Sequence, residues 1–115
     1  MRDTCPWGNY VILYRGPGYQ VKRIEINPKL RFSLQKHFKR AEKWIVLSGV
    51  GVATVGEKEI QVQSGSLVEI AVEQVHRMQN TGNEPLIFIE AQLGQYFGED
   101  DILRLEDDFH RAIDK

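Results

Sequence analysis

Four side chains able to bind a divalent metal ion stand at regular spacings in two segments of the chain. Gln35 and His37 are two residues apart, Glu42 follows after four more residues, and His76 lies in a later segment, shortly before Asn80. Residues two apart on a strand point to the same face, so Gln35 and His37 can converge on one point. Glu42 then comes from the next strand and His76 from a third. Imidazole and oxygen ligands together suit a divalent ion.

These ligands need a scaffold of short strands to position them. The pattern of most of the chain predicts such strands. Runs rich in Val, Ile, Leu, Tyr and Phe recur and end at Gly, Pro, Asn or charged residues, which is typical of strands joined by turns. In segment 19–26 charged residues fall on both faces, and a polar barrel interior would explain this. Strands at this spacing favour a β-sandwich or barrel, here over about residues 9–95. The predicted strands are 10–14, 19–26, 30–35, 43–48, 51–55, 59–62, 66–70, 76–80 and 86–93.

The tail of the chain has a helical pattern instead. Asp100 and Asp101 stand near its beginning, where negative charge favours a helix N-terminus. We therefore expect a short amphipathic helix over about 99–113, packed on the outside of the barrel. Its apolar stripe, at spacings of three and four, consists of Ile102, Leu105, Phe109 and Ala112.

Composition and charge narrow the class of protein. The 115 residues are 42% hydrophobic and 27% charged, which is ordinary for one globular domain covering residues 1–115. A net charge of −1 provides no positive field for nucleic acid. No apolar run approaches the roughly 20 residues of a membrane-spanning helix, and no leader peptide is visible. Cys5 is the only cysteine, so we expect no internal disulfide and a cytoplasmic location.

The spacing of the candidate ligands resembles the cupin superfamily. The first cupin motif runs Gly, five residues, His-x-His, three or four residues, Glu, six residues and Gly. Segment 29–49 follows this spacing, with Lys29 in place of the opening glycine and Gln35 in place of the first histidine. Segment 65–80 follows the second motif, with its histidine at His76. The resemblance implies an all-β fold, the jelly-roll barrel also called a double-stranded β-helix.

A narrower resemblance covers almost the whole chain. Six segments in the same order are similar to the C-terminal cupin domain of type II mannose-6-phosphate isomerases, a domain commonly fused behind a mannose-1-phosphate guanylyltransferase domain. In this family the glutamine of the Gln-x-His pair is usual. The glycine-rich nucleotidyltransferase signature is absent from these residues, so guanylyl transfer is not expected of them. The similar segments are 6–8, 19–24, 33–37, 40–44, 75–77 and 98–102.

This resemblance implies isomerisation of an aldose phosphate to a ketose phosphate, mannose 6-phosphate to fructose 6-phosphate. One divalent ion would be held by Gln35, His37, Glu42 and His76. Zn²⁺ is our first expectation, and Mn²⁺, Fe²⁺, Co²⁺ and Ni²⁺ also suit these ligands. Such an ion polarises a carbonyl and stabilises an enediolate.

Three cations are the expected catalytic residues, because a phosphate needs positive partners. They are Arg40, Arg104 and Lys22. Arginine matches a phosphate with two parallel hydrogen bonds. At the barrel mouth, Arg40 would hold the phosphate or stabilise the enediolate. The expected partner is thus a sugar phosphate or similar small anion, and pairing of cupin barrels leads us to expect a homodimer.

The chain departs from the family at Phe38, Lys39 and Lys43, where family members usually have histidine. Loss of a proton-relaying histidine would weaken acid–base catalysis by about 10²- to 10⁴-fold. The alternative function is therefore a non-catalytic, regulatory cupin that binds a sugar or a small acid. A third, a cupin dioxygenase or other metal oxidoreductase, more often uses three histidines with a glutamate, and Gln35 argues against it.

Overall fold

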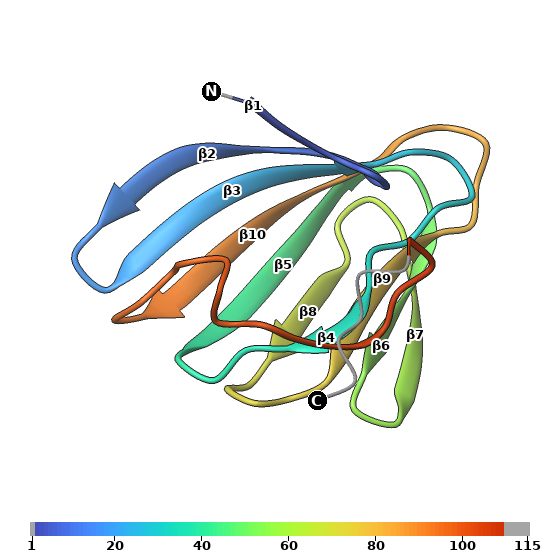
Figure 1. Ribbon diagram of the computed structural model, residues 1–115. Coiled ribbons are helices and arrows are strands. Elements are labelled where there is room, and N and C mark those ends of the chain that lie inside the picture. Colours follow the sequence, from blue (N-terminus) through green and yellow to red (C-terminus); the bar gives the residue numbers. More distant parts are fainter. Residues whose placement is uncertain (1, 110–115) are drawn as a thin grey trace.

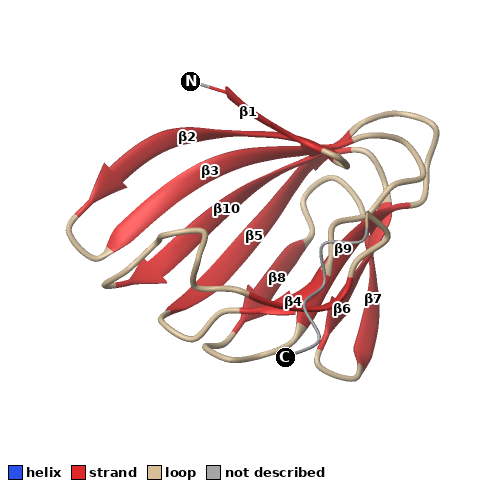
Figure 2. Ribbon diagram, viewed as in Figure 1, coloured by secondary structure: helices blue, strands red, loops and turns tan. Residues whose placement is uncertain are grey.

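A computed structural model describes residues 2–109 of the chain. Within this range the protein is built of strands alone, without a helix (Figures 1 and 2). The described part therefore has no helix with the length and apolar character needed to cross a membrane. The strands are β1 (Arg2–Cys5), β2 (Gly8–Gly16), β3 (Tyr19–Ile26), β4 (Leu34–Lys36), β5 (Arg40–Ser48), β6 (Gly51–Val55), β7 (Lys58–Val62), β8 (Leu67–Ile70), β9 (His76–Asn80), β10 (Leu86–Gly94) and β11 (Leu103–Glu106).

The strands form two antiparallel sheets that face each other as two layers (Figure 1). The six-stranded sheet has the order β1-β2-β3-β10-β5-β8, and the five-stranded sheet has the order β11-β4-β9-β6-β7. Several neighbours are far apart in sequence, as in a jelly roll: β10 pairs with both β3 and β5. The all-β prediction is confirmed.

The interior between the layers has an apolar half and a polar half. Along β3, β5 and β10 alternate residues point inward, and at one end of these strands the inward residues are apolar. At the other end they are polar and equally buried. This explains the charges on both faces of β3: Lys22 points inward and is 4% exposed. The apolar set includes Ile24, Ile26, Trp44, Val46, Leu86 and Phe88, and the polar set is Gln20, Lys22, Arg40, Glu42, Glu90 and Gln92.

Segment 30–35 is only partly a strand. Lys29 has a left-handed backbone with φ of 67°, and the Leu30 N–H donates to the Asn27 carbonyl, which makes a tight turn. Arg31 then forms an isolated bridge with Gln79 before β4 begins at Leu34. The predicted strand is therefore shorter than its apolar pattern suggested, because the chain turns to bring Gln35 beside β9.

The predicted C-terminal helix is wrong over the described residues. Leu103–Glu106 forms β11, which pairs with β4 of the five-stranded sheet. The Asp101 carboxylate, expected to favour a helix N-terminus, instead accepts the main-chain N–H groups of Phe38 and Lys39 at 3.2 and 2.9 Å. The open edge of β4 offers main-chain hydrogen bonds to this segment, and this outweighs helical periodicity. The remainder of the predicted helix, 110–113, lies outside the described residues.

Candidate metal centre

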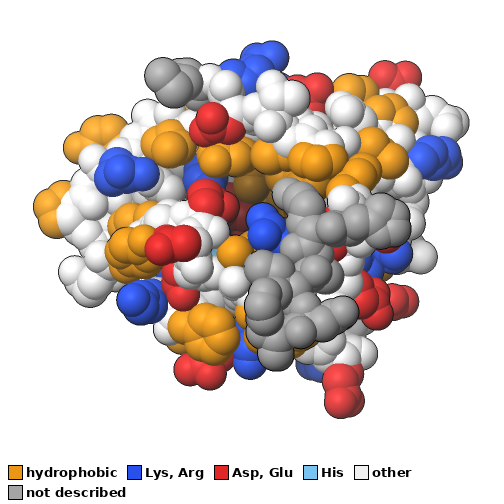
Figure 3. Space-filling model, viewed as in Figure 1, with side chains coloured by type: hydrophobic (Ala, Val, Ile, Leu, Met, Phe, Trp, Pro, Cys, Tyr) orange, Lys and Arg blue, Asp and Glu red, His pale blue; other side chains and the backbone are white. Residues whose placement is uncertain are grey.

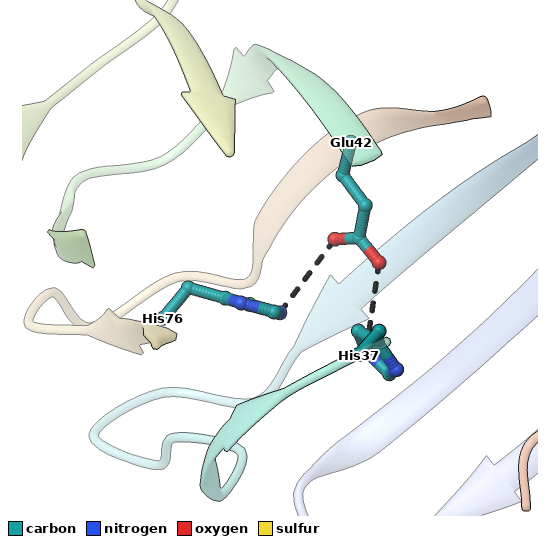
Figure 4. A group of neighbouring side chains, drawn as sticks. All are labelled: His37, Glu42 and His76. Atoms are coloured by element: carbon teal, nitrogen blue, oxygen red, sulfur yellow. Dashed lines mark ion pairs between the residues drawn. The ribbon is translucent and has the colours of Figure 1, made fainter. Parts of the chain in front are cut away.

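Three of the four predicted ligands meet between the layers: His37 directly after β4, Glu42 on β5 and His76 on β9 (Figure 4). One ligand atom from each lies within 4.8 Å of the others. The Nε2 atom of His37 is 3.6 Å from Glu42 Oε2, and the Nε2 atom of His76 is 3.7 Å from Glu42 Oε1. Atoms that share one ion at about 2.1 Å lie roughly 3 to 3.5 Å apart, so the three side chains are close to a ligating arrangement.

Both imidazoles are oriented by main-chain carbonyl groups. His37 Nδ1 lies 2.7 Å from the carbonyl oxygen of Asp101, and His76 Nδ1 lies 2.9 Å from that of Gln74. A carbonyl only accepts hydrogen bonds, so each Nδ1 carries the proton and each Nε2 presents a lone pair. Metal-binding histidines are commonly held in this way. Among the described residues, the buried Nε2 of His76 has no hydrogen-bond partner, which fits a ligand atom.

Burial keeps the two histidines neutral and thus able to bind a cation. Burial, with help from the nearby Arg40 guanidinium, lowers the pKa of His37 to about 4 against the opposing effect of the Glu42 charge. Burial also lowers the pKa of His76. For Glu42, burial alone would raise the pKa, but the imidazoles and Arg40 bring it below its usual range. The centre therefore combines two neutral imidazoles with one carboxylate, a donor set suited to Zn²⁺ and related ions.

Gln35 stands beside these three residues as the fourth predicted ligand. It is paired in register with His76 across β4 and β9, and its Nε2 is 3.4 Å from His37 Nε2. Only Oε1 of an amide can bind a metal, and this oxygen accepts the Ser33 hydroxyl at 2.6 Å. Because the amide nitrogen faces His37 and the oxygen faces Ser33, Gln35 would direct Oε1 toward an ion beside His37 only after its amide turns over.

Arg40 lies inside the protein rather than at its mouth, with 3% of its side chain exposed. Its Nε donates to Glu42 Oε2 at 2.9 Å, and its Nη2 lies 3.1 Å from His37 Nε2. The other Glu42 oxygen accepts the Trp44 indole N–H at 3.0 Å. The ligands are thus embedded in a buried hydrogen-bond network that fixes the carboxylate.

A cavity of about 70 Å³ adjoins the centre, and all three predicted cations line it. Lys22 is 5% exposed at its side chain and donates to Glu99 Oε2 at 2.7 Å. Arg104 on β11 is in register with Gln35, and its buried Nε has no hydrogen-bond partner within residues 2–109. Figure 3 shows a hollow on this side of the molecule, with apolar, acidic and basic side chains around it. The arrangement provides positive charge directly beside the three converging ligands.

A family model described as "Mannose-6-phosphate isomerase C-terminal" matches residues 2–107. The chain belongs to this family. Two relatives are the alginate biosynthesis protein AlgA of Pseudomonas aeruginosa and the xanthan biosynthesis protein XanB of Xanthomonas campestris pv. campestris. AlgA is 44% identical over 109 residues, 95% of this chain, and XanB is 44% identical over 107 residues, 93% of this chain. This member of the family spans 23% of the length of each.

Solved structures confirm the cupin fold of this mannose-6-phosphate isomerase C-terminal domain. The capsular polysaccharide assembling protein CapF of Staphylococcus aureus superposes with a TM-score of 0.82 at 22% identity, covering 92% of this chain and 34% of that chain. The cupin domain of Schizosaccharomyces pombe Cnp3 gives a TM-score of 0.72 at 11% identity, covering 75% and 64%. At such identities the similarity concerns the fold alone.

The three departures from the family pattern lie away from this interior. Phe38 and Lys39 are exposed in the loop before β5, where Lys39 Nζ lies over the Tyr96 ring. Lys43 points out of β5, is 57% exposed and pairs with Glu69. None of the three side chains at these positions therefore contributes to the cavity wall.

Sequence reasoning missed several polar residues of the interior. Glu90 and Gln92 stand two apart in the apolar run of β10, on the face shared with Leu86 and Phe88. This alternation was a signal that they point inward. Asp101 gave no such signal, because its contacts with segment 37–39 join residues more than sixty positions apart.

Proposed function

We propose that this chain is a metal-dependent aldose–ketose isomerase that converts mannose 6-phosphate to fructose 6-phosphate. The observation that carries the proposal is the convergence of His37, Glu42 and His76 beside a cavity with three cationic side chains. The two histidines, Glu42 and the Gln35 Oε1 atom would hold one divalent ion, Zn²⁺ by first preference. When bound, the ion supplies a Lewis acid that polarises the sugar carbonyl and stabilises an enediolate.

The buried cations would bind and orient the substrate. Lys22 and Arg40 are held by the Glu99 carboxylate, whose Oε2 lies 2.7 Å from Lys22 Nζ and 3.8 Å from Arg40 Nη1. A phosphate carries the same type of charge and would take the place of that carboxylate. Arg104, whose buried Nε has no hydrogen-bond partner among the described residues, adds a donor on the opposite sheet. A cavity of about 70 Å³ is smaller than a typical ligand pocket of roughly 300 Å³ or more, so binding requires Glu99 to move aside.

A second candidate function is a non-catalytic cupin that binds a sugar or a small acid. The position of Arg40 among the candidate metal ligands favours this function. Its Nε donates to Glu42 Oε2 at 2.9 Å, and its Nη2 lies 3.1 Å from His37 Nε2. In such a protein the guanidinium would balance the Glu42 charge in place of an ion.

Metal analysis and a coupled assay separate the two candidates. Purified protein loaded with Zn²⁺ or Mn²⁺ is expected to retain one ion per chain and to form fructose 6-phosphate from mannose 6-phosphate. The His76→Ala variant should lose both properties. The Glu69→Gln variant, at an exposed position of β8, is the control that keeps both. Retained metal without turnover would favour the binding protein, and no retained metal would contradict the metal centre.

A further inference from the structure

Glu90 is a buried carboxyl group that the metal centre does not use. It lies on β10, in register with Lys22 of β3 on one side and with Trp44 of β5 on the other. Its side chain is 4% exposed, and it forms part of the wall of the cavity that also contains Lys22, Arg40 and Gln35. A carboxyl group in the wall of a small cavity is in direct reach of a molecule bound there.

A line of buried amides holds this carboxyl group in place. Gln92 Nε2 donates to Glu90 Oε2 at 2.5 Å, and Gln20 Nε2 donates to Gln92 Oε1 at 2.7 Å. At the outer end, Arg15 Nε donates to Gln20 Oε1 at 2.5 Å. Gln20 and Gln92 are 1% and 0% exposed. In both glutamines the amide oxygen accepts from the residue on the Arg15 side, and the amide nitrogen donates to the residue on the Glu90 side. All hydrogen bonds of the line therefore run in one direction, from Arg15 to Glu90. The line holds Glu90 through Oε2.

The charges around Glu90 allow it to gain and lose a proton near neutral pH. Burial raises the pKa of Glu90 to about 8, and the negative charge of Glu42 on β5 contributes. Lys22 on β3 and Arg40 on β5 act in the opposite direction. Glu99, which pairs with both cations, faces the same cavity from the segment after β10. A group with a pKa close to the working pH is effective as both base and acid.

We propose that Glu90 is the catalytic acid–base of the isomerisation, an inference that rests on the proposed function. Its carboxylate takes the proton from C2 of the aldose as the C2–H bond breaks. That electron pair forms the C1–C2 double bond, and the carbonyl π electrons move to O1. The proton on O2 passes to O1, C2 becomes the carbonyl carbon, and Glu90 returns its proton to C1. Atoms and electrons balance without an external oxidant or reductant.

The Glu90→Gln variant tests this assignment, because it keeps the shape and removes the proton acceptor. Compared with wild type, we expect kcat to fall by about 10²- to 10⁴-fold, with KM and metal content unchanged. In D₂O, wild type should place deuterium at C1 of fructose 6-phosphate, and the variant should lose this exchange. The Glu69→Gln variant is the matched control at an exposed position.

The outcomes distinguish this inference from the proposed function. If wild type isomerises the sugar phosphate and Glu90→Gln retains wild-type kcat, Glu90 is not the acid–base but the isomerase proposal stands. If wild type forms no fructose 6-phosphate, both proposals fail together. Should Glu90→Gln not fold, Glu90→Asp decides: a tenfold or greater loss in kcat with unchanged metal content supports the assignment, and wild-type kcat overturns it.

Discussion

The imidazole of His37 is hydrogen-bonded through Nδ1 to the main-chain carbonyl of Asp101, 2.7 Å away and 64 positions later in the chain. The Asp101 carboxylate also accepts the N–H groups of Phe38 and Lys39. The segment between β10 and β11 is therefore tied to the loop that carries His37, a candidate metal ligand. Both the orientation of His37 and the order of that loop depend on these contacts.

The Asp101→Ala variant should weaken metal binding without removing a ligand. Loss of hydrogen bonds to a buried carboxylate costs about 1.5–3 kcal/mol of unfolding free energy, and loosening the support of a metal ligand lowers metal affinity by about 10- to 100-fold. Urea denaturation and competitive metal titration measure the two effects. The neighbouring Asp100→Ala variant is the control, because Asp100 is exposed and its carboxylate accepts the hydroxyl of the exposed Tyr96. Equal metal affinities for the two variants would contradict this role of Asp101.

Removing Arg40 should make stability depend on metal. Arg40 and Glu42 form a buried ion pair at 2.9 Å, and removal of one partner of such a pair costs about 3–5 kcal/mol. A divalent ion would restore positive charge beside Glu42, so Zn²⁺ should raise the Tm of Arg40→Gln more than that of wild type. Differential scanning calorimetry with and without Zn²⁺ measures this. Arg23→Gln, which changes an outward-facing arginine, should respond as wild type does; a Tm gain no larger for Arg40→Gln than for wild type would count against the prediction.

The metal-free protein should lose stability as the pH falls below neutral because of His37. The pKa of its imidazole is about 4 in the folded protein, against 6.5 for a free imidazole. The unfolded chain thus takes up this proton first. Neutral His37 contributes up to about 3 kcal/mol to the free energy of unfolding. This contribution is fully present above pH 6.5 and is lost as the pH falls toward 4.

Urea titrations of wild type and His37→Gln in the presence of a chelator measure this contribution as the difference between the two proteins. Glu90, whose pKa is raised to about 8, affects stability with the opposite pH dependence. Because wild type and His37→Gln both contain Glu90, its effect cancels in the difference. Wild type should lose more stability between pH 7 and pH 4 than His37→Gln does. Identical losses would show that His37 is not buried as a neutral imidazole.

Glu99 and Lys22 should change anion binding in opposite directions. Glu99→Gln removes the carboxylate that pairs with Lys22, so mannose 6-phosphate should bind several-fold more tightly. Lys22→Gln removes a buried charged donor and should weaken binding by about 10- to 100-fold. Calorimetric titration with mannose 6-phosphate, and with mannose as the uncharged reference, separates the phosphate contribution. Lys29→Gln, at an exposed turn, is the control; equal affinities in all three variants would rule out a phosphate site at Lys22.

The pattern of residues was sufficient for most of the strands, although not for β1 or β11, and it selected three side chains that meet in the fold, His37, Glu42 and His76. Alternation of inward and outward side chains holds along β3, β5 and β10, so the two-residue spacing of Gln35 and His37 did place them side by side. These are local properties of an extended chain, and they can be read without knowing the fold. The C-terminal segment shows the limit of such local reading. Its apolar spacing matches a helix, yet pairing of β11 with β4 decides its conformation.

By itself, the sequence determined most of the strands between residues 10 and 93, the cupin spacing and the candidate ligands Gln35, His37, Glu42 and His76. Only the tertiary structure decided what surrounds those ligands: the Arg40 contact with Glu42, and the line of amides that ends at Glu90. The physical reason is the range of the interactions. Alternation along a strand is encoded within a few residues, whereas Gln20 and Gln92 meet across 72 positions only when β3 and β10 pair in one register.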